Sequence, residues 1–79
     1  MKVPRDINGI ELITTLTKLG YYKTNQVGSH IKLTTTQEGE HHITIPNHSP
    51  IKIGTLNNIL KDIANHFGIS REDLVKRIF

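Results

Sequence analysis

The sequence predicts one small α+β domain in which helices cover one face of an antiparallel three-stranded sheet. Two observations predict this class. Apolar residues recur at helical spacing near the start of the chain and again from Gly54, whereas residues 21–46 alternate apolar and polar side chains as strands do. Helices and strands segregated in this order pack as two layers around one core. Because 79 residues leave room for a single core, we expect residues 1–79 to form one domain with the order α-β-β-β-α and a short further helix.

The first helix is predicted over residues 9–19. Its apolar stripe consists of Leu12, Ile13, Leu16 and Leu19. Asn8 is a favourable N-cap residue, and Glu11 stands three positions later, where the acid of a capping box reaches back to the cap. Gly20 supplies the residue that closes a helix in the left-handed region. These signals define both ends of the helix.

A three-stranded meander is predicted between Tyr21 and Pro46, with breaks at Val27-Gly28 and at residues 37–39. Successive side chains of a strand point to opposite faces. Aliphatic side chains therefore share one face of the second and third strands: Ile31, Leu33, Ile43 and Ile45. The opposite face, called the open face below, carries polar side chains: His30, Lys32, Thr34, His42 and Thr44. We expect the open face to be uncovered and Tyr21 to pack in the core.

A second helix is predicted to begin near Gly54 and to end at Gly68. Its apolar stripe consists of Leu56, Ile59, Leu60, Ile63 and Phe67. Ser70 then opens a short third helix, in which Ile69 and Leu74 occupy the positions of a hydrophobic staple. The third helix would pack on the core through Leu74, Val75, Ile78 and Phe79.

Composition narrows the class of protein. Ten Lys and Arg against seven Asp and Glu give a net charge of +3 and a pI near 9.5, which favours a polyanionic partner such as nucleic acid. Because the chain has no cysteine, we expect no disulfide, no thiolate metal site and a cytoplasmic location. The segment Met1-Lys2-Val3-Pro4-Arg5-Asp6 lacks the apolar stretch of a signal peptide, and no apolar run is long enough to cross a membrane. We therefore predict a protein that is neither secreted nor membrane-spanning.

The segment Gly28-Ser29-His30-Ile31-Lys32 is the strongest candidate for a reactive site. A glycine turn leads directly into a strand that projects His30 and Lys32 from the open face. An imidazole has an unperturbed pKa of about 6.5, so it can both accept and donate a proton near neutral pH. RNA transesterification needs both, because the 2′-hydroxyl loses a proton and the 5′-oxygen gains one. Lys32 and the backbone N–H groups near Gly28 could hold the phosphate, although a lone Ser-His pair is by itself more typical of an ordinary surface.

Five histidines also suggest a metal site. His41 and His42 are adjacent on one strand, so they point to opposite faces and cannot join one simple coordination sphere, which argues against a zinc site. His42 could join the open-face cluster, and His48 could flank it from the loop after the third strand. For His41 and His66 we expect lone surface histidines.

Several short segments stand in one order along the chain: Gly20-Tyr21, Gln26-Val27-Gly28-Ser29-His30, Ile45-Pro46-Asn47-His48, Gly54-Thr55-Leu56 and Ile59-Leu60. As an ordered set they resemble the HicA toxin family over roughly residues 7–79. The resemblance implies a fold like that of a double-stranded-RNA-binding domain and an mRNA interferase whose catalytic histidine is His30 here. It also implies neutralisation by a HicB-type antitoxin. One departure is Asn25, since a basic residue often precedes the glutamine in the family.

The resulting hypothesis is the toxin of a type II toxin–antitoxin system, an endoribonuclease that needs no metal or other cofactor. His30 acts as general acid or base, and RNA is bound by Gly28, Ser29, Lys32, Lys23, His42 and His48. We expect mRNA and a HicB-type antitoxin as partners, no membrane association, and a monomeric free toxin. One rival is a non-catalytic module that reads A-form RNA through Lys23, Lys32 and Lys52. A pure protein-interaction domain is a third hypothesis, and the salt dependence of binding would separate it from the others.

Overall fold

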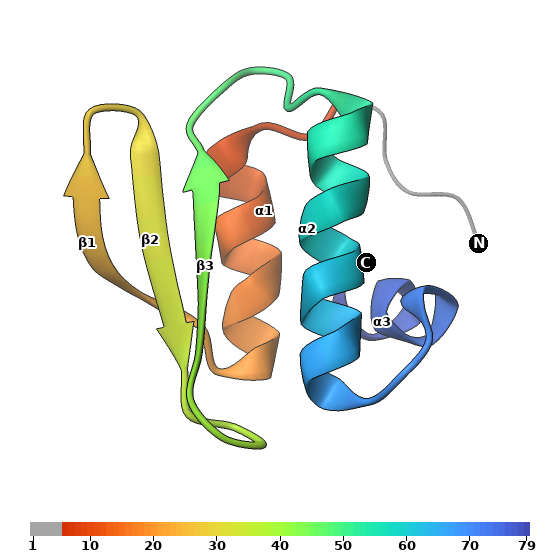
Figure 1. Cartoon of the computed structure of the whole chain (residues 1–79). Coiled ribbons are helices and arrows are strands. Elements are labelled where there is room, and N and C mark those ends of the chain that lie inside the picture. The colour runs from red at the N-terminus through yellow and green to blue at the C-terminus, as the bar shows by residue number, and fades with distance from the viewer. Residues whose placement is uncertain (1–5) are drawn as a thin grey trace.

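The computed structural model describes residues 6–79 and confirms the predicted α+β class (Figure 1). The elements in chain order are α1 Gly9–Leu16, the 3₁₀ turn η1 Thr17–Leu19, β1 Tyr22–Val27, β2 His30–Thr35, β3 His41–Pro46, α2 Ile53–Phe67 and α3 Arg71–Ile78. Helices α1 and α2 both contact β3, and α3 contacts α2. Residues 1–5, which carry most of the segment used to predict the absence of a signal peptide, lie outside the described residues.

The first helix has the predicted ends but tightens in its last turn. Asn8 Oδ1 accepts a hydrogen bond from Glu11 N–H at 2.8 Å, and Glu11 Oε1 accepts one from Asn8 N–H at 3.2 Å, which completes the capping box. The predicted span 9–19 is divided between α1 and η1, and Gly20 N–H donates to the Thr17 carbonyl at 3.0 Å. Gly20 then closes the segment with a φ of 79°.

The sheet is an antiparallel meander in the order β1-β2-β3. Gly28 and Ser29 form a two-residue loop between β1 and β2, and Gly28 has a φ of 59°. A positive φ at the first central position is what a type II′ hairpin turn requires, and glycine adopts it without strain. The register places His30 opposite Val27 on β1 and opposite Pro46 on β3. The turn therefore fixes the position of the candidate histidine.

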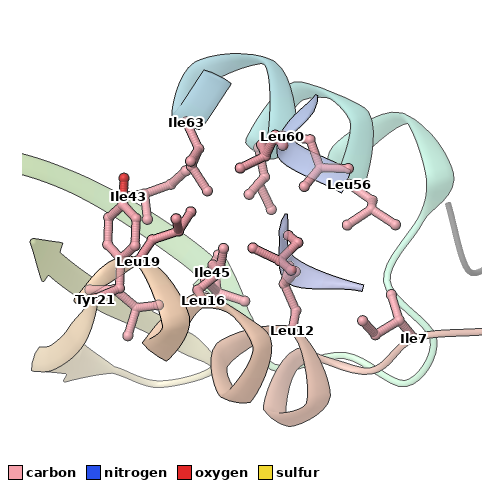
Figure 2. Close-up of a cluster of buried hydrophobic side chains, with 14 of the residues drawn as sticks. Ile7, Leu12, Leu16, Leu19, Tyr21, Ile43, Ile45, Leu56, Leu60 and Ile63 are labelled. Atoms are coloured by element: carbon pink, nitrogen blue, oxygen red, sulfur yellow. The ribbon is translucent and has the colours of Figure 1, made fainter. Parts of the chain in front are cut away.

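The core lies between the helices and the inner face of β2 and β3 (Figure 2). Its largest members include Leu12, Leu16, Leu33, Ile45, Leu56, Leu60 and Ile63. Tyr21 is buried as predicted, with only 2% of its surface exposed. Every residue of β1, in contrast, is exposed, because the helices cover β2 and β3 and leave β1 at the far side of the sheet (Figure 1). Ligands can therefore reach β1 as well as the open face.

The two C-terminal helices follow the predicted pattern. Helix α2 begins at Ile53, one residue before the predicted start, and Gly68 closes it with a φ of 65°. Ser70 Oγ accepts a hydrogen bond from Asp73 N–H at 3.1 Å, which caps α3. The loop that leads into α2 is anchored by Ile51, which is buried and whose N–H donates to the Ile7 carbonyl at 2.9 Å.

Candidate functional site

His30 is the first residue of β2, and its side chain is exposed on the open face. A Cβ at Gly28, two residues before His30, would meet nothing within 4 Å, so the backbone of the turn is open to a ligand. The ring hydrogen bonds within residues 6–79 engage three histidines, His41, His42 and His66. The His30 ring has no such partner in this part of the chain, so both of its nitrogens are available for proton transfer.

Lys32 follows on the same face, two residues along β2, opposite Thr44 of β3. Side chains two residues apart on a strand start about 7 Å from one another. The Lys32 side chain is exposed, and no carboxylate among the described residues forms an ion pair with it. A lysine stem is long and flexible, so the ammonium group and the His30 ring can reach the same phosphodiester.

The loop after β3 lies beside the hairpin turn. Asn47 N–H donates to the Ser29 carbonyl at 2.7 Å, and Gly9 N–H donates to the His48 carbonyl at 3.1 Å. The exposed His48 borders a surface pocket of about 240 Å³, which is lined by Pro46, His48, Pro50, Ile51, Lys52 and Thr55. Because Pro46 is the residue paired with His30, this pocket adjoins the candidate site, and the structure brings His48 to the same end of the sheet.

His42 lies farther from His30 than the shared face suggested. It pairs with Thr34, four residues along β2 from His30, which is about 13 Å at the usual rise of a strand. Its Nδ1 is 2.8 Å from Thr34 Oγ1, and its Nε2 is 3.1 Å from Glu40 Oε2. A carboxylate only accepts, so His42 Nε2 carries the proton and points it toward Glu40. The structure therefore places His42 in a hydrogen-bond network of its own, apart from His30.

Lys23 is also separated from the cluster. It pairs with Leu33, whose side chain faces the core, and paired residues of an antiparallel sheet share a face. Lys23 is exposed because the helices do not cover β1. Its side chain consequently leaves the sheet on the side opposite Lys32.

The prediction that His41 and His66 are lone surface histidines is wrong. Tyr21 O–H lies 2.7 Å from His41 Nδ1, and His41 Nε2 lies 3.3 Å from Asp62 Oδ1. The His66 ring stacks on His41 with centroids 4.4 Å apart, and its Nε2 donates to the Gln37 carbonyl at 2.9 Å. Sequence periodicity did not show that the start of β3 and the end of α2 contact one another beside the β2–β3 hairpin loop.

Burial raises the pKa of Tyr21 well above its ordinary value near 10, and the Asp62 carboxylate raises it further. Both effects keep the phenol protonated. Since Asp62 can only accept, His41 Nε2–H donates to it, and the remaining ring nitrogen accepts the Tyr21 proton. This chain of hydrogen bonds holds the histidine in one orientation against the core.

Gly9 positions the site and was not identified from the sequence. A Cβ at this position would lie 2.7 Å from the Pro46 carbonyl oxygen and 2.9 Å from Asn47 Cα. Only glycine allows the start of α1 to approach the loop so closely, and that loop carries His48. The available signal was a glycine inside a helix just after the N-cap, where glycine is otherwise unfavourable.

None of the helices within residues 6–79 has the length and apolar character that crossing a bilayer requires. In the same part of the chain, no three His, Asp or Glu side chains gather closely enough to hold a metal ion.

The chain is a small basic α+β domain whose sheet has one uncovered face. On that face, the side chains of His30 and Lys32 are exposed and form no hydrogen bond or ion pair within residues 6–79, so the face suits a polyanionic ligand. A family model described as the HicA toxin of bacterial toxin–antitoxin systems matches residues 9–64. Because the match covers more than half of the chain, the chain belongs to the HicA toxin family. Membership implies, in general terms, RNA as substrate and a HicB antitoxin as partner. Searches of curated proteins and of solved structures gave no significant match.

Proposed function

We propose that this chain is a metal-independent endoribonuclease, the mRNA interferase toxin of a type II toxin–antitoxin pair, and that His30 is its catalytic residue. The observation that carries the proposal is the exposed His30 ring, which has no hydrogen-bond partner among the described residues and lies beside Lys32 in a HicA family chain. A module that only binds RNA needs the lysine and not the free imidazole. Catalysis needs both.

In the proposed reaction, one basic group removes the proton from the 2′-hydroxyl of the RNA. The 2′-oxygen attacks the adjacent phosphorus, the bond from phosphorus to the 5′-oxygen breaks, and a second group donates a proton to that oxygen. The products are a 2′,3′-cyclic phosphate and a 5′-hydroxyl. His30 takes one of the two proton-transfer roles, while Lys32 and the N–H groups of the Gly28-Ser29 turn stabilise the charge on the phosphate oxygens.

For the second proton-transfer role we propose His48 in preference to His42. His48 lies two residues after Pro46, the residue paired with His30, and its ring is not engaged by the hydrogen bonds of the described residues. His42 lies about 13 Å along the sheet and is held by Thr34 and Glu40. His42 then contacts a neighbouring nucleotide, and Lys23 contacts phosphate around the exposed edge of β1.

The antitoxin proposed for this chain is an acidic HicB-type protein that covers the open face. A face that attracts phosphate through Lys32 also attracts carboxylates, so the same side chains serve both ligands. The free toxin acts as a monomeric single domain in the cytoplasm.

The proposal is tested by incubating the purified chain with a defined RNA in excess EDTA and analysing the termini of the products. We expect cleavage to continue and to leave a 2′,3′-cyclic phosphate or the 3′-phosphate formed from it. A 2′-deoxy sugar at the scissile position should block cleavage, and His30→Gln should reduce the rate by about 10²–10⁴. RNA binding without any product would establish the non-catalytic module instead.

The matched control is His42→Gln, which removes a histidine from the same face at the distant position. We expect this variant to keep most of the activity. If His42→Gln is as damaging as His30→Gln, the reacting phosphate lies between the two histidines, and the assignment of His48 is wrong.

A further inference from the structure

The outer edge of β3 has backbone hydrogen-bonding groups that the sheet does not use. The bond from Asn47 N–H to the Ser29 carbonyl fixes which residue pairs exchange hydrogen bonds, since these alternate along an antiparallel ladder. By this alternation, the N–H and C=O groups of His42 and Thr44 point away from β2. In Figure 1, β3 is the edge strand on the side of α2. Four backbone groups are therefore directed outward from the middle of this edge.

The two edges of the sheet differ in how well they resist pairing with another strand. The pairing of β1 with β2 shifts register between Lys23 and Asn25, and an irregularity with a lysine beside it is a usual way to protect an edge. The pairing of β2 with β3 runs from His30↔Pro46 to Thr35↔His41 without a shift. Strand β3 also carries no lysine and no carboxylate. It is the edge that remains suited to accept a strand.

A groove lies along this edge, between β3 and α2. It has a volume of about 370 Å³ and is lined by His42, Ile43, Thr44, Thr55, Asn58, Ile59 and Asp62. A groove between an edge strand and a helix suits an extended peptide, because the peptide backbone pairs with the strand while alternate side chains enter the groove. The outward groups of His42 and Thr44 supply the first of these features, and the α2 residues supply the second.

The charge in the groove indicates which side chain would enter it. Asp62 is its only charged carboxylate, 58% of that side chain is exposed, and only His41 pairs with it in the described part of the chain. Ile43 and Ile59 provide an apolar floor. An arginine or lysine side chain fits the apolar floor and the Asp62 carboxylate together, because its methylene groups pack on apolar surface while its charged group reaches the carboxylate. A second copy of β3 brings no such cation and has Pro46 at one end of the edge.

We propose that the β3 edge and this groove bind an extended segment of the antitoxin, which adds as a fourth strand next to β3 and places a basic side chain beside Asp62. The identity of the partner rests on the proposed toxin function, whereas the recognition of an extended basic segment does not. The added strand would extend the sheet and bring the rest of the antitoxin next to the open face. Docking would then use the backbone edge of β3 and the Asp62 carboxylate, whereas coverage of the catalytic face would use side chains of the open face such as His30 and Lys32.

In the first test, synthetic peptides are titrated into the full chain carrying His30→Ala, and their binding is monitored by NMR. The probe is the capped peptide Thr-Val-Arg-Val-Thr, and the controls replace its arginine by glutamate or N-methylate its central amide. We expect the arginine peptide to shift the amide signals of His42 and Thr44 and to slow their hydrogen exchange. Both control peptides should bind about tenfold more weakly or worse. No shift at millimolar peptide, or shifts confined to β1, would overturn the proposal.

The second test uses two proline substitutions at outward-pointing edge positions. Thr44→Pro removes an outward N–H of β3 without removing a bond to β2, and Gln26→Pro is the matched change on β1, where the N–H bonds only to the Asn25 side chain. Peptide binding should be lost in Thr44→Pro and kept in Gln26→Pro, with thermal unfolding recorded for both. If Thr44→Pro unfolds the chain, Asp62→Asn serves instead, because it keeps an acceptor for His41 while removing the charge.

The two proposals fail in distinguishable ways. Cleavage of RNA by Asp62→Asn in a chain with His30 intact should equal that of wild type, because Asp62 lines the groove between β3 and α2 and is not part of the reacting site. A chain that binds the peptide and cleaves no RNA would refute the ribonuclease proposal alone. A dimer of the free chain whose His42 and Thr44 amides are protected would show that a second copy occupies the edge, and would refute the docking proposal alone.

Discussion

The histidines at the two ends of the sheet differ in exposure and in hydrogen bonding. At the end formed by the Gly28-Ser29 turn and the loop after β3, His30 and His48 are exposed, and hydrogen bonds of the described residues leave their rings free. At the other end, under the β2–β3 hairpin, His41 is held between Tyr21 and Asp62. The same residue type is available for chemistry at one end and structural at the other.

This difference shows that environment, more than residue type, separates a candidate catalyst from a structural residue. A histidine whose two ring nitrogens both bond to other protein groups can take a proton directly from a substrate only after one of those hydrogen bonds gives way to the substrate. His30, which directly follows the Gly28-Ser29 turn, makes no such bond within residues 6–79. The predictions below test whether function and stability are divided between the two ends in this way.

The largest effect is expected from His30→Ala at the free end. Expression of the wild-type chain should arrest growth, and the variant should relieve the arrest, because loss of an acid–base group lowers a rate by about 10²–10⁴. Its circular-dichroism spectrum should match that of wild type, and its stability should change by less than about 0.5 kcal/mol, as at other exposed positions. If expression of the wild-type chain is harmless in several hosts, or if the variant is unfolded, function and stability are not divided between the two ends of the sheet.

A substitution outside the reacting groups should disturb the free end through its backbone. In Gly9→Ala, the new methyl group would meet the Pro46 carbonyl and Asn47 Cα at under 3.0 Å, so the loop that carries His48 must move. We expect a loss of about 1–3 kcal/mol in urea unfolding, typical of overpacking, together with slower cleavage by the folded protein. Gly54→Ala is the control, since a Cβ at this position would meet nothing within 4 Å. This variant should stabilise the chain by about 0.4–1 kcal/mol.

The structural end should show the reverse pattern in His41→Ala. The buried Tyr21 hydroxyl would lose its acceptor and His66 its stacking partner, which should lower the free energy of unfolding by about 1–3 kcal/mol. RNA cleavage by the folded fraction should stay at the wild-type rate. If cleavage falls while stability is unchanged, the chain of Tyr21, His41 and Asp62 takes part in the reaction, and the free end is not the whole site.

Much of the fold follows from local signals in the sequence. The capping box of α1, the positive-φ glycines and the spacing of apolar residues are local signals that depend on a few neighbouring positions. The predicted start of the first helix and both ends of α2 are therefore confirmed to within a residue, although the last three residues of the first helix form η1. Period-two alternation also placed His30 and Lys32 on one face. It could not show that the helices leave β1 uncovered, because coverage depends on how layers pack.

The parts of the site that escaped prediction all depend on tertiary proximity. His41 and His66 are 25 positions apart in the sequence, and their stacking exists only because α2 returns beside β3. The separation of His42 from His30 follows from the pairing register of β2 and β3. Alternation shows which face a side chain occupies and does not show which residues lie opposite one another. Gly9 was missed because the Pro46 carbonyl that it accommodates is distant in sequence. Local patterns identify a face of a sheet, and only the packed chain shows which of its side chains are free.

The smallest effect expected concerns the charge on the open face. Lys32→Glu places a carboxylate where the proposed phosphate binds, whereas Lys76→Glu makes the same charge change on exposed α3. In a His30→Ala background, which prevents cleavage during titration, Lys32→Glu should weaken RNA binding by about tenfold and reduce the salt slope by about 1, since one phosphate contact is lost. It should also weaken co-purification with an acidic antitoxin, because the same lysine faces carboxylates in that complex. Lys76→Glu should leave both measurements near wild type. If Lys76→Glu is the more damaging variant for RNA, the binding surface lies on the helical layer, and the free end of the sheet is not where RNA is held.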